Sequence, residues 1–189
     1  MRGYVAVEGL MVVDWRRVPA ADFRIPEGAG LADLTAELTG LLGDPDPALR
    51  SEVAVPVLTT WIERGVYDDL MVGLGDGIAT GLTATRPADR AVLRRTSSAA
   101  VLGAVLARDN RRTLVPREKV LEWGDRLATW LLAETELGAG AIAVGADALG
   151  ELVASPRCGR GELRAVLDVL GERVVADTTG PWQAGEADR

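Results

Sequence analysis

The chain has 189 residues, of which 48% are hydrophobic and 26% are charged, a composition typical of one domain with a sizeable core. It contains no histidine and only one cysteine, Cys158, which excludes a Ser-His-Asp triad, a Cys-His dyad, a histidine metal ligand, an internal disulfide and a cysteine zinc site. The formal net charge of −7 disfavours binding to a phosphate backbone, so we expect no nucleic acid partner. We also expect no metal and no cofactor.

The first predicted elements lie before residue 43. The apolar residues 5–13 are open to two interpretations, a β-strand or a helix that continues through Trp15. Leucines spaced three and four residues apart then predict an amphipathic helix over residues 31–42.

The next helix is predicted over residues 47–64 from its boundary signals. Asp46 fits the N-cap and Pro47 the first helical position, where the missing N–H of proline is not needed. Pro56 lies inside this helix and should kink it. Gly65 fits the left-handed residue that ends it.

Five further helices are predicted from apolar stripes with helical spacing. They cover residues 68–82, 92–108, 116–131, 142–153 and 162–175. Residues 1–176 are therefore expected to form a single helical domain, and the polar residues 177–189 a flexible C-terminal tail. The fold class is all-α with about seven or eight helices. Two architectures remain open, namely HEAT-like antiparallel helix pairs in one right-handed array and a compact bundle.

A glycine-rich stretch, Gly73-Leu74-Gly75-Asp76-Gly77, has some likeness to a dinucleotide-binding fingerprint. That fingerprint requires a strand before the glycines, and none is predicted here. The glycines interrupt an apolar helical stripe instead. We interpret them as helix positions at which a neighbouring element packs closely.

Residues 86–112 carry seven arginines and two aspartates, a local charge of +5 in an acidic chain. The simplest interpretation is a solvated helix and loop. The alternative is a surface that binds an acidic protein or peptide, with Arg90, Arg94 and Arg95 as its first contacts.

Arg95 falls near the apolar side of its predicted helix, where a guanidinium needs a carboxylate partner. Glu134 and Asp147 are the candidate partners. A structural ion pair is the simpler interpretation, and the polar floor of a ligand pocket that includes Ser98 is the alternative. Ser98 has no histidine base, so we do not expect it to be a nucleophile.

Three tryptophans, Trp61, Trp123 and Trp130, lie on apolar helical stripes. Most tryptophans at such positions pack in or around the core. The alternative is that Trp61, Trp123 or Trp130 forms the apolar wall of a pocket between helices.

Four short motifs resemble the bacterial family called domain of unknown function 2785. They are Leu-Leu-Gly-Asp-Pro-Asp at 41–46, Trp-Ile-Glu-Arg-Gly at 61–65, Arg-Thr-Ser-Ser-Ala-Ala-Val-Leu at 95–102 and Gly-Ala-Asp-Ala-Leu at 145–149. The resemblance covers residues 15–175 and implies an all-helical, HEAT-like fold with no established activity. The chain departs from the family at Gly140 and Val144, where the family carries two histidines, so any chemistry of that pair should be missing here.

These features favour a non-catalytic scaffold rather than an enzyme. The expected partner is a protein or peptide, and an acidic one would suit the arginine-rich segment. The alternative is a small-molecule-binding protein or an enzyme with a carboxylate and arginine pocket between helices, built from Arg95, Glu134 and Asp147. No apolar run is long enough to span a bilayer, and no cleavage site follows the N-terminal apolar residues. We therefore expect a cytoplasmic location and no membrane partner.

Overall fold

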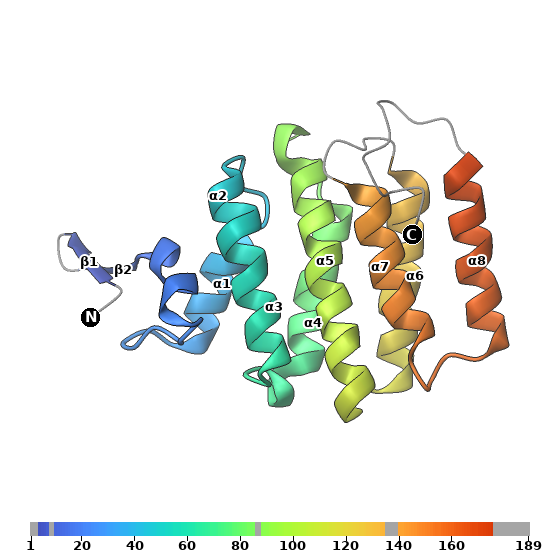
Figure 1. Cartoon of the computed structure of the whole chain (residues 1–189), viewed down its shortest axis with the longest axis horizontal. Helices are drawn as coiled ribbons and strands as arrows, with labels where there is room; N and C mark the ends of the chain where they lie inside the picture. The colour runs from blue at the N-terminus through green and yellow to red at the C-terminus, as the bar shows by residue number, and fades with distance from the viewer. Residues whose placement is uncertain (1–3, 8–9, 86–87, 135–139, 176–189) are drawn as a thin grey trace.

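The computed structural model describes residues 4–7, 10–85, 88–134 and 140–175, which form an N-terminal β-hairpin followed by helices (Figure 1). Strands β1 (Tyr4–Val7) and β2 (Leu10–Val13) pair antiparallel. The helices are α1 (Leu31–Leu41), α2 (Pro47–Leu49), α3 (Val55–Glu63), α4 (Met71–Thr80), α5 (Ala88–Arg112), α6 (Arg117–Ala133), α7 (Ala141–Val153) and α8 (Arg160–Val175). The prediction of an all-α fold with about seven helices is confirmed, since α2 is a single turn leading into α3.

The N-terminal apolar segment is extended, as one of its two interpretations expected, but it forms two short strands rather than one. The predicted tail, residues 177–189, lies outside the described residues. None of the helices described here is both long enough and apolar enough to cross a lipid bilayer.

The helices lie in two rows (Figure 1). Helices α3, α5 and α7 pack side by side in the front row, α4 and α6 pack side by side behind them, and α8 closes the end of the array against both α6 and α7. Consecutive helices alternate between the rows, with α4 packed on α5 and α6 packed on α7. Helices α1 and α8 therefore lie at opposite ends of the array (Figure 1).

The core runs continuously through both rows and is largely aliphatic, with Trp61 and Trp123 among its largest fully buried side chains. Trp61 on α3 donates from Nε1 to the carbonyl oxygen of Phe23 at 2.7 Å. Its ring also packs at a tilt against Trp15 and Tyr67, with ring centroids 6.3 Å and 6.5 Å away. Trp61 thus fixes the segment before α1 onto α3, and the interpretation of this residue as core is confirmed.

The boundary signals around α2 and α3 are confirmed. The Asp46 carboxylate accepts a hydrogen bond from the backbone N–H of Ala48 at 2.9 Å, and Pro47 begins α2. Pro56 has no N–H to donate to the preceding turn, and the segment just before α3, Arg50–Ala54, widens into π-helix. Gly65 has a φ of +81° and follows the last turn of α3, as a left-handed stop should.

The glycines of α4 differ in their surroundings. A Cβ added to Gly75 would lie 2.3 Å from the ring of Trp123 on α6, so only glycine fits there. Added Cβ atoms at Gly73 and Gly77 would meet nothing within 4 Å. The close-packing interpretation is therefore confirmed for Gly75 and wrong for Gly73 and Gly77.

Candidate functional site

Arg95 has the carboxylate partner that its position requires, and that partner is Glu134. Arg95 Nε lies 2.7 Å from Glu134 Oε2, and Arg95 Nη2 lies 3.0 Å from Glu134 Oε1. Trp130 Nε1 donates to Glu134 Oε2 at 3.1 Å, and Arg95 Nη1 donates to the carbonyl oxygen of Ala84 at 2.8 Å. The Glu134 side chain is only 2% exposed. The Arg95–Glu134 pair therefore links α5 to the C-terminal end of α6, and Arg95 also links α5 to the segment that follows α4.

Other arginines of the basic segment also bind within the chain. Arg94 donates to the carbonyl oxygen of Thr39 on α1, and burial lowers the pKa of its guanidinium. Arg108 makes two hydrogen bonds to Asp68, at 2.9 Å and 2.6 Å. Arg90 is exposed near the start of α5. The basic segment therefore contributes several of its charges to ties between α5 and its neighbours.

Ser98 lies on the buried face of α5, where its hydroxyl has no hydrogen-bond partner among the residues that the structure describes. Gly81 makes room for it, since a Cβ added to Gly81 would lie 2.1 Å from Ser98 Oγ. A buried hydroxyl without a partner has lost its hydration without gaining a hydrogen bond, which costs free energy.

Ser98→Ala is expected to leave the free energy of unfolding unchanged or to raise it by up to about 1 kcal/mol, because it removes this unsatisfied hydroxyl. Urea denaturation followed by circular dichroism measures the change. The matched control is Thr35→Val, which removes a hydroxyl that bonds both Leu31 and Tyr67 and should lower stability by about 1 kcal/mol. A loss of stability for Ser98→Ala as large as that of the control would show that the Ser98 hydroxyl makes a stabilising hydrogen bond.

Asp147 lies apart from Arg95, on the exposed side of α7. It borders a shallow hollow of about 270 Å³ between α5 and α7. The hollow is otherwise lined by Ala100, Gly103, Ala104, Ala107, Val144, Ala148 and Glu151. The structure thus brings together Arg95, Trp130 and Glu134 of the predicted residues, and places Trp61 and Asp147 elsewhere.

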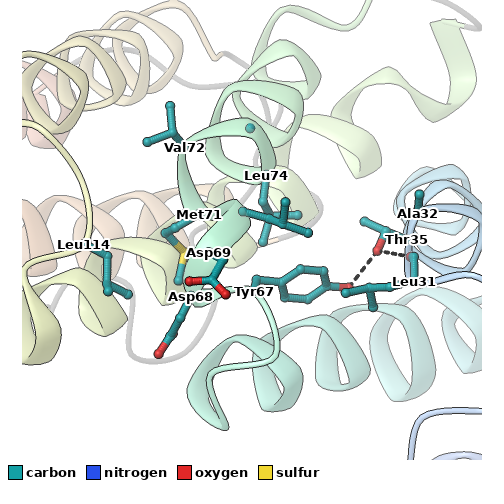
Figure 2. A pocket seen from close by; sticks show the side chains of 12 residues that line it. Leu31, Ala32, Thr35, Tyr67, Asp68, Asp69, Met71, Val72, Leu74 and Leu114 are labelled. Carbon is teal, nitrogen blue, oxygen red and sulfur yellow. Dashed lines mark hydrogen bonds between the residues drawn. The ribbon is translucent and has the colours of Figure 1, made fainter.

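A larger hollow of about 460 Å³, half-open to solvent, lies between α1 and the start of α4 (Figure 2). It is lined by Leu31, Ala32, Thr35, Tyr67, Asp68, Asp69, Leu70, Met71, Val72, Gly73, Leu74 and Leu114. None of the residues predicted for a site lines it. Leu70 has the spacing of the apolar stripe predicted over residues 68–82, yet it is not buried with that stripe, since it is 56% exposed at the edge of the hollow.

The polar groups of Tyr67 and Thr35 in this hollow are satisfied and neutral. Thr35 Oγ1 donates its proton to the carbonyl oxygen of Leu31 at 2.7 Å, so the hydroxyl of Tyr67, 2.9 Å away, must donate to Thr35 (Figure 2). Burial raises the pKa of Tyr67, which keeps its hydroxyl protonated. Tyr67 and Thr35 therefore add no charge to the hollow.

The rim of the hollow carries two carboxylates with different surroundings. Asp68 is held by Arg108, whose hydrogen bonds lower the pKa of that carboxyl. Asp69 is exposed, and no hydrogen bond or ion pair joins it to the described part of the chain. The hollow thus combines apolar walls with one free negative charge at its edge. Within the described residues, no three His, Cys, Asp or Glu side chains cluster in a way that could hold a metal ion.

Asp68 should stabilise the fold only while its carboxylate is ionised. Because its folded pKa is lowered from 3.8, its contribution is fully present above about pH 4 and is lost as the pH falls through the lowered value. Asp68→Asn should therefore lower the free energy of unfolding at pH 7 and make its decline in acid shallower. Urea denaturation from pH 7 down to about pH 2 measures both effects. Asp69→Asn is the control and should follow the wild-type curve, and parallel curves for all three proteins would refute the role of Asp68.

A scan against family models matches residues 81–189 to the family described as protein of unknown function (DUF2785). The matched residues make up more than half of the chain and include α5 to α8, with the motifs at 95–102 and 145–149. Searches of curated proteins and of solved structures gave no match. The resemblance noted in the sequence is therefore confirmed, and the chain belongs to the DUF2785 family of proteins of unknown function.

Proposed function

We propose that this protein is a non-catalytic scaffold of HEAT-like helix pairs that binds a protein partner in the hollow between α1 and α4. The pairwise packing of α4 with α5 and of α6 with α7, in two rows, supports the HEAT-like description. The observation that carries the binding proposal is the half-open apolar hollow with the exposed Leu70 at its edge.

The shape of the hollow favours a protein side chain over an enclosed small molecule. Its volume of about 460 Å³ would hold a small molecule, but its open side would leave much of such a ligand in contact with solvent. Leu70, at 56% exposure, offers apolar surface beside the opening that only a larger partner would cover. The free carboxylate of Asp69 favours a lysine or arginine next to the inserted apolar side chain.

The two sites expected from the sequence have less support. Arg95 and Glu134 satisfy each other and Trp130, and neither lines either hollow described above. A surface for an acidic partner would need free guanidinium groups, whereas Arg94, Arg95 and Arg108 bind groups of this chain.

The test uses fluorescently labelled peptides with one central leucine, phenylalanine or tryptophan, flanked by arginine, serine or glutamate. Anisotropy titrations with the full chain should show the tightest binding for an arginine-flanked peptide. Leu70→Gln should weaken that binding at least ~10-fold, as expected for loss of an apolar contact at the centre of an interface. Asp69→Arg should reverse the order of the arginine and glutamate peptides.

Matched controls separate the hollow from the general surface. Leu132→Gln replaces a leucine of α6 that is 41% exposed, and Asp125→Arg replaces an exposed aspartate of α6; neither residue lines the hollow. Both should leave binding unchanged. Equal binding of the three flanking classes, or equal losses in the controls and in Leu70→Gln, would reject the proposal.

A further inference from the structure

Helix α8 ends the array and keeps apolar side chains on its outer side. It packs on α6 and α7, with Val166 and Arg173 buried. Leu163 and Leu167, one turn apart, are 44% and 59% exposed. A helix at the end of a stacked array normally has a polar outer face, so this exposed leucine pair requires an explanation.

A row of four charged residues runs beside the two leucines. Arg160, Arg164, Asp168 and Glu172 follow one another at four-residue spacing, and all four are exposed. No hydrogen bond or ion pair joins any of them to another residue that the structure describes. The row therefore presents two positive charges in the first half of α8 and two negative charges in the second half.

The order of these charges does not serve α8 itself. A helix favours acidic residues near its N-terminus and basic residues near its C-terminus, which is the reverse of this row. The spacing of Arg164 before Asp168 is also the less favourable order for an ion pair within a helix. The pattern is self-complementary for antiparallel pairing, because a second copy of the helix running the other way would place its negative charges opposite the positive ones.

We infer that α8 is a homodimer surface that pairs antiparallel with α8 of a second copy of this chain. A two-fold axis beside residue 166 places Arg164 opposite Asp168 of the second copy and Arg160 opposite Glu172 of the second copy. Each pair occurs twice. A helix rises about 1.5 Å per residue. Measured along the helix axis, Leu163 therefore lies within about 3 Å of Leu167 of the second copy. The apolar contact and the ion pairs thus form together in one orientation, independently of the proposed partner site.

The test measures self-association by sedimentation equilibrium over a wide range of protein concentrations. The wild-type chain should form a reversible dimer that weakens at high salt. Arg160→Glu with Arg164→Glu gives a wholly acidic row, and Asp168→Arg with Glu172→Arg gives a wholly basic one. Each double variant should raise the dissociation constant of its own dimer on the order of 100-fold, and an equimolar mixture of the two should form a heterodimer.

Two further variants address the leucines and other occupants of this surface. Leu163→Gln with Leu167→Gln should abolish the dimer, while Leu132→Gln on α6 should not. A wild-type chain that stays monomeric at all concentrations overturns the inference, as does a dimer that both charge variants retain. If the wild type is monomeric and a chain ending at Val175 dimerises, residues 176–189 shield α8, and the inference is likewise wrong for the intact protein.

Discussion

Gly75→Ala is expected to lower the free energy of unfolding by about 3 kcal/mol, because the added methyl group would overlap the indole of Trp123. The ring cannot move aside easily. It is fully buried, and its Nε1 donates to Asp76 Oδ1 on α4 at 2.9 Å. The clash must therefore be relieved by separating α4 from α6, which lie side by side in the rear row. Urea denaturation followed by circular dichroism measures the loss.

Gly73 and Gly77 on the same helix provide matched controls. Alanine at either position meets open space and has the higher helix propensity, so each variant should be neutral or more stable by about 0.5–1 kcal/mol. If all three alanine variants lose the same stability, the effect comes from α4 itself and the close contact with Trp123 does not limit this position.

Glu134→Ala is expected to destabilise the fold by about 3 kcal/mol, since it leaves a largely buried Arg95 guanidinium without its counter-charge. Trp130 Nε1 loses its acceptor at the same time. Arg95 is 20% exposed and keeps its bond to the carbonyl oxygen of Ala84, which places the loss at the lower end of the range for broken buried pairs. Thermal and urea denaturation both report it.

The control replaces both charges with apolar groups of similar length. Arg95→Met combined with Glu134→Leu removes the uncompensated charge and should lose less stability than Glu134→Ala alone. The remaining loss reflects the unpaired Trp130 N–H and should be about 1 kcal/mol. A double variant less stable than Glu134→Ala would show that the Arg95–Glu134 pair stabilises the fold by more than the cost of burying its two charges.

The spacing of apolar residues predicted where the helices lie, but it predicted burial least well at the helix ends. Leu70 has the right spacing for the stripe that includes Leu74, yet it belongs to a 3-10 turn, Asp68–Leu70, before α4 begins. The tighter winding of that turn rotates Leu70 away from the core. Residues 5–13 gave two interpretations because a short apolar run fits a strand and a helix equally well.

The ion pair could be predicted because its chemistry is local and obligatory. An arginine on an apolar helix face needs a carboxylate, and the sequence offered Glu134 and Asp147 as candidates. Only the packing of α5 against α6 selects Glu134. The hollow could not be predicted in this way, since its walls come from α1 and α4 and contain ordinary apolar residues. Its position depends on the spacing between two helices, which no residue type encodes.

The two-row arrangement also affects how the molecule opens. Each helix packs mainly on its neighbours along and across the rows, so we expect segments at either end to open more readily than the middle. Helix α5 packs on α3, α4, α6 and α7 and should open only when the whole chain unfolds. Backbone amides of α5 should therefore exchange with deuterium most slowly, with protection falling towards α1 on one side and α8 on the other.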